Sequence, residues 1–95
     1  MHEIKRALYL AIRESIQNSK KHGLASKVII AFERKDNSIA LMFKDNGKGF
    51  ELSTVRSGLG LINQRKRVVE LNGTYDLKSQ LNEGIKTSIT IPLRA

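Results

Sequence analysis

The feature that most constrains the fold is the corner at residues 44–50, which reads KDNGKGF. An alternating apolar run at residues 38–43 leads into this corner, and the Asp, Asn and Gly residues that follow cannot continue a strand. The chain must therefore change direction at Asp45. A hairpin turn at Asn46-Gly47 is the simplest interpretation. A carboxylate at a strand end, followed by glycines that let a ligand approach the backbone, also suits the binding of a flat polar group.

The composition limits the chain to one small folded domain, residues 1–95, because 40% of its residues are hydrophobic and one core is all that this length can build. The chain has no Cys, which excludes a disulfide framework, a thiolate metal site and a Cys nucleophile. Its apolar runs are too short to cross a bilayer and its start lacks a secretory pattern. We therefore expect a soluble, cytoplasmic domain, which is compatible with a membrane-anchored parent protein.

The net charge of +8 favours an anionic partner, such as nucleic acid, a lipid surface or a phosphorylated ligand. The basic residues are dispersed, and only the run Arg65–Arg67 is dense. The few aromatic residues are not interleaved with these charges, so the stacking platforms of single-strand binders are missing. A positive field that attracts a nucleotide fits the charge equally well.

Residues 3–21 have apolar side chains at three- and four-residue spacing, which predicts an amphipathic helix of about five turns. Gly23 is placed to end it. Glu14 and Asn18 are four residues apart, so they lie on the same side of this helix, and their oxygens could hold a hydrated magnesium ion. The alternative is a solvated polar surface, with His22 interacting only with the helix dipole.

The rest of the chain alternates between strand and helix patterns. Residues 26–35 and 39–43 predict an antiparallel hairpin with its turn at residues 36–38, residues 51–57 predict a loop, residues 61–71 predict a helix capped by Asn72 and Gly73, and residues 74–80 and 85–91 predict two more strands. We therefore predict an α/β fold: a two-layer sandwich with the helices on one face of a mixed, mostly antiparallel sheet.

Three ordered motifs resemble those of the catalytic and ATP-binding domain of two-component sensor histidine kinases, in the GHKL ATPase group with its Bergerat fold. Residues 14–22, ESIQNSKKH, resemble the N box of this family. Residues 45–49 resemble its first glycine box and residues 58–61 resemble its second. The resemblance covers nearly the whole chain, and three motifs in the right order are far more specific than any one alone.

The resemblance implies two groups of site residues. On the adenine side, Asp45 would accept a hydrogen bond from the amino group, and Gly47 and Gly49 would let the ring pack against the backbone. On the phosphate side, Asn18 would coordinate magnesium and Glu14 would orient or polarise the attacking group. The remaining phosphate-side contacts would come from Lys21, His22, Gly58 and Gly60, the two glycines through backbone NH groups at a helix start.

The sequence departs from the family pattern in two places. Only about seven residues separate Phe50 from Gly58, so the lid over the nucleotide is short, as in the subfamily whose partners are helix-turn-helix response regulators. Ile85 follows Gly84 where the family usually has Thr. Either Thr87 substitutes for that residue or the affinity for nucleotide is reduced.

The resemblance implies an ATP-dependent protein histidine kinase domain that positions Mg-ATP for γ-phosphoryl transfer. The acceptor would be a histidine on a separate dimerisation domain of the parent kinase, with a response regulator as an indirect partner and no direct contact with nucleic acid. Neither His2 nor His22 lies in the long helical hairpin that carries such an acceptor, so we expect an excised part of a larger sensor. Two alternatives are a serine kinase of the anti-sigma type on the same fold and a basic nucleic-acid-binding module.

Overall fold

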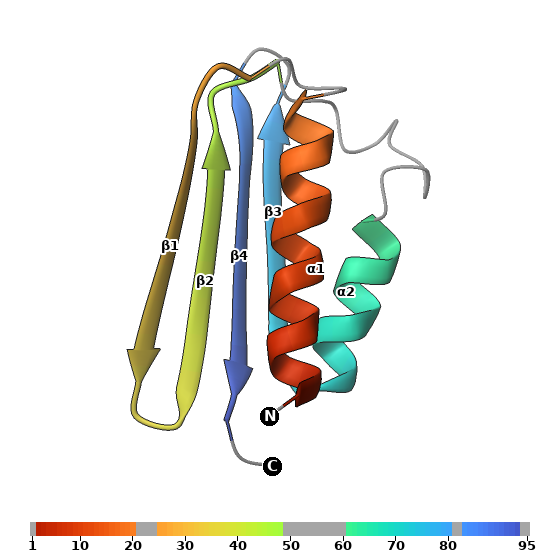
Figure 1. The fold of residues 1–95 in the computed structure, drawn as a ribbon, viewed down its shortest axis with the longest axis vertical. Coiled ribbons are helices and arrows are strands. Elements are labelled where there is room, and N and C mark those ends of the chain that lie inside the picture. Colours follow the sequence, from red (N-terminus) through yellow and green to blue (C-terminus); the bar gives the residue numbers. More distant parts are fainter. Residues whose placement is uncertain (1, 21–24, 49–60, 81–82, 94–95) are drawn as a thin grey trace.

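A computed structural model describes residues 2–20, 25–48, 61–80 and 83–93. The elements in chain order are α1 (His2–Asn18), β1 (Val28–Lys35), β2 (Ser38–Asp45), α2 (Leu61–Glu70), β3 (Thr74–Gln80) and β4 (Gly84–Pro92). Both helices lie on the same side of one sheet (Figure 1). The predicted two-layer α/β sandwich is therefore confirmed. In the described part of the chain, neither helix is both long enough and apolar enough to span a membrane.

The four described strands are arranged in the order β1-β2-β4-β3, and the three ladders between them are antiparallel. The parallel pairing that a mixed sheet allows does not occur among these strands. The last strand, β4, lies between β2 and β3 and joins the two hairpins (Figure 1). Because β2 and β4 run in opposite directions, the end of β2 at Asp45 meets the start of β4 at Gly84.

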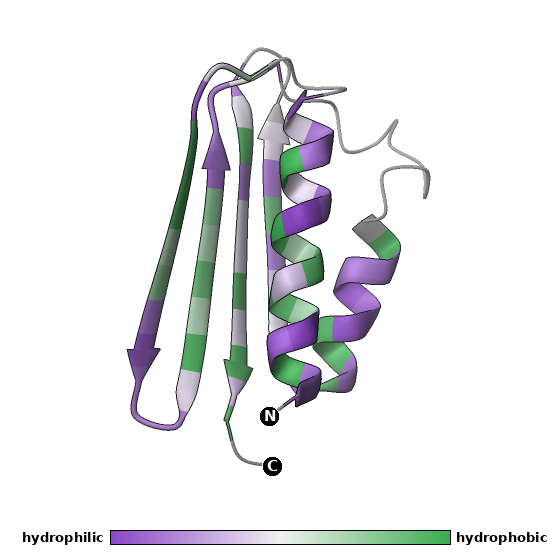
Figure 2. Ribbon diagram, viewed as in Figure 1, coloured by the Kyte–Doolittle hydropathy of each residue, from purple (hydrophilic) through white to green (hydrophobic). Residues whose placement is uncertain are grey.

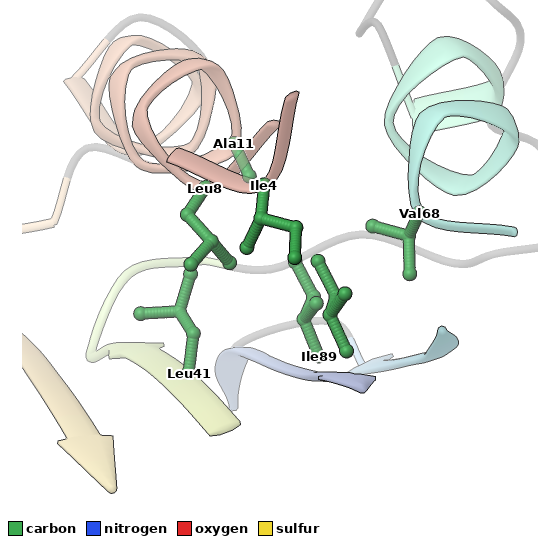
Figure 3. Close-up of a cluster of buried hydrophobic side chains, with 7 residues drawn as sticks. Ile4, Leu8, Ala11, Leu41, Val68 and Ile89 are labelled. Atoms are coloured by element: carbon green, nitrogen blue, oxygen red, sulfur yellow. The ribbon is translucent and has the colours of Figure 1, made fainter. Parts of the chain in front are cut away.

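The core lies between the helices and the inner face of the sheet. Ile4, Leu8 and Ala11 follow the helical spacing along α1, and Ile4 and Leu8 point toward Leu41 and Ile89 on the sheet (Figure 3). Val68 adds a buried apolar side chain from α2 and is 1% exposed. Full burial of a side chain of this size contributes about 1.5–3 kcal/mol, so these contacts explain why the helices are held on the sheet.

Strand β1 forms as predicted, yet all eight of its residues are exposed. Its first part is apolar (Figure 2), and Phe32 on the inner face is 55% exposed. The strand lies at the edge of the sheet, beyond the area that the helices cover (Figure 1). Alternating apolar residues therefore predicted the strand correctly, but they carry no information on whether a helix reaches over it.

The helix ends differ in how well the sequence predicted them. The α-helical part of α1 stops at Asn18, before the predicted residue 21, and Ser19 and Lys20 continue it as a wider turn. At the end of α2, Asn72 has a positive φ of 64°, and the NH of Gly73 donates to the carbonyl of Val68 at 2.9 Å, as in a helix cap of the predicted kind. The predicted cap at Gly23 and the predicted loop at residues 51–57 lie outside the described residues.

Candidate functional site

Asp45 is a buried carboxylate at the end of β2, and its side chain is 3% exposed. Its Oδ1 accepts hydrogen bonds from the backbone NH of Gly47 at 3.0 Å and of Ile85 at 3.1 Å. Its Oδ2 accepts one from the hydroxyl of Ser19 at 2.5 Å. A buried carboxylate is costly unless donors replace its hydration, and these three donors do so.

The partners of Asp45 come from three parts of the chain. Ser19 follows Asn18 directly at the end of α1, Gly47 lies in the corner after β2, and Ile85 is the second residue of β4. One carboxylate therefore fixes the end of α1 against the corner and the start of β4. The structure thus brings two of the predicted site residues, Asp45 and Asn18, into the same neighbourhood.

Asn46 anchors the corner to the segment before β1. Its Oδ1 accepts from the NH groups of Ser26 and Lys27 at 3.0 and 2.9 Å, and its Nδ2 donates to the Ser26 hydroxyl at 3.0 Å. The hairpin interpretation of Asn46-Gly47 is wrong, because β2 pairs with β1 and β4, and the next described element is a helix. Sequence reasoning missed this role of Asn46, since its partners are about twenty residues away.

Thr87 and Asn18 lie around one small cavity of about 10 Å³, whose other lining residues are Ser15, Phe43, Leu77 and Ile85. Thr87 is 2% exposed, and its Oγ1 is buried without a hydrogen-bond partner among the described residues. Ile85 lies two residues earlier on the same face of β4, and its backbone NH donates to Asp45. The only side-chain hydroxyl that β4 places at this cavity is therefore that of Thr87.

Glu14 lies one turn before Asn18 and contacts α2. The Nη2 of Arg67 donates to the Oε2 of Glu14 at 3.3 Å, and both side chains are partly buried. Nearby, the Tyr75 hydroxyl of β3 donates to the Oε1 of Gln64 at 2.8 Å. The sequence suggested neither contact, although Arg67 belongs to the one dense basic run of the chain.

The pKa of Tyr75 is raised to about 12, first by burial and then by the negative charge of Glu14, while Arg65 opposes the shift. The folded pKa lies above the ordinary value of 10.0, so the folded state keeps a proton that the unfolded chain loses. This contribution to stability is complete below about pH 10 and is lost as the pH rises toward about 12.

We therefore expect wild-type stability to fall more steeply than that of the Tyr75→Phe variant between about pH 10 and 12, because Phe has no proton to lose. Urea midpoints measured across this range would show the difference. Tyr9→Phe is the matched control, since Tyr9 is 61% exposed, and it should keep the wild-type slope. Equal slopes for the wild type and Tyr75→Phe would contradict the burial of this hydroxyl.

Five predicted site residues, Lys21, His22, Gly49, Gly58 and Gly60, lie outside the described residues. The geometry above therefore concerns the acid of the first glycine box and the first part of the N box. A larger hollow of about 610 Å³ lies between α1 and α2, away from Asp45, and includes Glu3, Leu10 and Glu70 in its lining.

The two-layer sandwich, with an acid at a strand end tied to a helix that carries Glu14 and Asn18, is the arrangement that the resemblance to histidine kinase ATP-binding domains implies. The chain belongs to the family described as "Histidine kinase-, DNA gyrase B-, and HSP90-like ATPase", whose model matches residues 3–95. The resemblance inferred from the three motifs is thereby confirmed.

The chain is similar to parts of two named bacterial kinases. It is 34% identical over 88 residues to the signal transduction histidine-protein kinase/phosphatase DegS of Brevibacillus brevis, a match that covers 92% of this chain and 23% of the relative. It is 31% identical over 87 residues to the sensor protein VraS of Staphylococcus aureus, covering 90% of this chain and 25% of the relative. The chain thus spans about a quarter of the length of the curated relatives it matches.

Two solved structures share the fold. The histidine kinase domain of the blue-light activated histidine kinase EL346 from Erythrobacter litoralis superposes with a TM-score of 0.80 at 19% identity, over 96% of this chain and 45% of that one. The histidine kinase AdeS from Acinetobacter baumannii gives a TM-score of 0.76 at 24% identity, over 95% of this chain and 47% of that one. At these identities the likeness concerns the fold alone.

Proposed function

We propose that this chain binds Mg-ATP and positions the γ-phosphate for transfer to a histidine on a separate dimerisation domain, as a histidine kinase catalytic domain. Family membership and the names of the similar relatives support the reaction class. The observation that carries the proposal is the hydrogen bond between Asp45 and Ser19, the residue after Asn18. It would keep the proposed acceptor for the base, Asp45, close to the proposed metal ligand, Asn18.

Asp45 is proposed to recognise adenine. Each carboxylate oxygen can accept more than one hydrogen bond, and among the described residues Oδ2 accepts one from the Ser19 hydroxyl. Oδ2 could therefore accept a further hydrogen bond from the amino group of the base. Gly47 and Gly49 lack side chains that would keep a ring from the backbone. The buried hydroxyl of Thr87, with no partner among the described residues, provides the polar group that Ile85 cannot.

Asn18 is proposed to hold magnesium through its amide oxygen. The described residues contain no group of three or more His, Cys, Asp or Glu side chains that could hold a metal ion. Mg²⁺ takes one or two protein ligands and fills its remaining positions with water and phosphate oxygens, so one amide oxygen from α1 would be enough. When bound, the metal would neutralise phosphate charge.

The remaining proposed roles follow the family pattern. Glu14 would orient or polarise the attacking group, Lys21 and His22 would contact phosphate or ribose, and Gly58 and Gly60 would donate backbone NH groups to phosphate. Phosphoryl transfer requires mainly positioning and charge neutralisation, so this set needs no protein nucleophile.

We also propose that these 95 residues form one domain of a longer cytoplasmic or membrane-anchored sensor. The curated relatives are about four times as long as the stretch they share with this chain. The missing part would supply the acceptor histidine, and a response regulator would then receive the phosphoryl group. Neither the serine kinase nor the nucleic-acid module is favoured, because the similar relatives include proteins named as histidine-protein kinases.

The Asn18→Ala variant tests the metal role. We expect Mg²⁺ to strengthen binding of a fluorescent ATP analogue to the wild type by about tenfold, equivalent to about 1.4 kcal/mol, and to have little effect on the variant. The measurement is a titration with and without Mg²⁺. Gln17→Ala is the matched control, since Gln17 is an exposed amide on the same helix, and it should behave like the wild type.

Two outcomes would reject the proposal. If the wild type binds no analogue at millimolar concentration, the chain is not an ATP-binding domain. If Mg²⁺ strengthens binding to Asn18→Ala as much as to the wild type, Asn18 is not the ligand. Salt-dependent binding of duplex DNA that persists without Asp45 and Asn18 would support the nucleic-acid alternative instead.

A further inference from the structure

The junction of α1, α2 and β3 contains a cluster of polar side chains that the roles above do not explain. Arg67 on α2 pairs with Glu14 on α1, and Tyr75 on β3 donates to Gln64 on α2. Gln64 is 1% exposed, so the cluster continues into the interior. The two helices carry different family motifs, because α1 holds the N box acid and α2 begins at Leu61, the last residue of the second glycine box.

The Glu14 carboxylate uses its two oxygens differently. Its Oε2 accepts from the Nη2 of Arg67 at 3.3 Å, whereas its Oε1 is buried and has no partner among the described residues. The Nη1 of Arg67 is also buried, and it too has no hydrogen-bond partner in the part of the chain that the structure describes. A guanidinium often contacts a carboxylate through two NH groups at once, so this single contact leaves one acceptor oxygen of Glu14 and one donor nitrogen of Arg67 without a hydrogen bond among the described residues.

We infer that Arg67 is a positioning residue, which holds Glu14 by Oε2 and leaves Oε1 unpaired for the attacking group, which must enter the buried space beside that oxygen. The inference rests on the proposed function and extends it to a residue on the second helix. An unrestrained glutamate side chain has several rotamers, and fixing one costs up to about 2 kcal/mol of conformational entropy. The contact with Arg67 fixes the Glu14 rotamer before the nucleotide binds, so this entropy is not lost during the reaction.

The geometry of the neighbours supports this division of the two oxygens. The Tyr75 hydroxyl donates its hydrogen bond to Gln64 and so does not donate to Glu14. Arg67 lies two turns into a helix that packs against α1, and its guanidinium is rigid and planar. The side chain of Arg67 is 27% exposed and that of Glu14 is 29% exposed. Water therefore competes with their ion pair less than it would at an open surface.

The test compares Arg67→Met, Glu14→Gln and the double variant of the 95-residue chain in Mg-ATP hydrolysis and ATP-analogue binding. We expect Arg67→Met to lower kcat by about tenfold or more while KM and Kd change less than about twofold, as for Glu14→Gln. The double variant should be no slower than Glu14→Gln alone, because both changes remove one function. Arg67→Lys, which keeps the charge without the planar fork, should fall between the wild type and Arg67→Met.

Lys66→Met is the matched control, because it removes a cation from the exposed neighbouring position of α2 and should leave kcat unchanged. The inference is overturned if Arg67→Met keeps the wild-type kcat. It is also overturned if the effects of Arg67→Met and Glu14→Gln multiply in the double variant, since that would mean independent roles.

A second measurement separates this inference from the proposed function. Urea unfolding of the wild type, Arg67→Met, Glu14→Gln and the double variant gives the coupling between Glu14 and Arg67 without any nucleotide. We expect the folding equilibrium constant of the double variant to differ about threefold or more from the product of the two single effects. No coupling would overturn the inference even if ATP binds. If Glu14 and Arg67 are coupled in unfolding but the chain does not bind ATP, the proposed function is rejected. The positioning role is then rejected too, and only the structural contact between the two side chains is supported. If Arg67→Met is unfolded at the assay temperature, Arg67→Lys provides both readouts.

Discussion

The Asp45→Asn variant should bind ATP about a hundredfold more weakly than the wild type. Asn has nearly the same size, but one of its two terminal groups is an NH₂ donor, and it would face donors already present at Ser19, Gly47 and Ile85. A hydrogen bond to a charged group contributes about 1.5–3 kcal/mol, and a hundredfold change corresponds to about 2.7 kcal/mol. Isothermal titration with a nonhydrolysable ATP analogue would measure it.

The base itself provides a sharper test of the same role. Inosine triphosphate lacks the adenine amino group, so the wild type should prefer ATP over it and the Asp45→Asn variant should not. Asp76→Asn is the matched control, because it makes the same chemical change at an exposed position on β3. Unchanged ATP affinity in Asp45→Asn, measured below its melting temperature, would remove Asp45 from the site.

The element positions could be predicted well because they depend on local periodicity. The three-four spacing in residues 3–21 predicted α1, and period-two alternation predicted all four strands to within about two residues at each end. The end of α1 was less certain, since Ser19 continues the turn with its hydroxyl on Asp45. A contact between residues 26 positions apart decides it, and no local pattern contains that information.

The sequence predicted the site only in part, because the contacts that build it join residues far apart in the chain. The sequence marked Asp45 as the acid of the corner, because a strand pattern stops there. It did not reveal how that acid is held, since the NH of Ile85 is 40 residues away along the chain. Arg67 and Glu14 are 53 residues apart, and only the packing of α2 against α1 brings them together.

Gly84→Ala should unfold the start of β4 and remove the site with it. Gly84 has a φ of +80°, which residues with a Cβ rarely adopt, and a Cβ there would lie 2.2 Å from the backbone oxygen of Asp45. Positive φ and a clash with backbone each cost about 1–3 kcal/mol, so we expect a loss of about 3 kcal/mol or more. Urea unfolding monitored by circular dichroism would measure the change.

The same substitution should also weaken ATP binding, because Gly84 precedes the Ile85 NH that donates to Asp45. Glu83→Ala is the matched control, since Glu83 is exposed and adjacent, and surface changes of this kind usually shift stability by less than about 0.5 kcal/mol. If Gly84→Ala lost less than about 1 kcal/mol and bound ATP normally, the close approach of β4 to the end of β2 would be wrong. The position of Asp45 between the helix end and β4 depends on that approach, so this substitution tests the architecture of the site and its chemistry together.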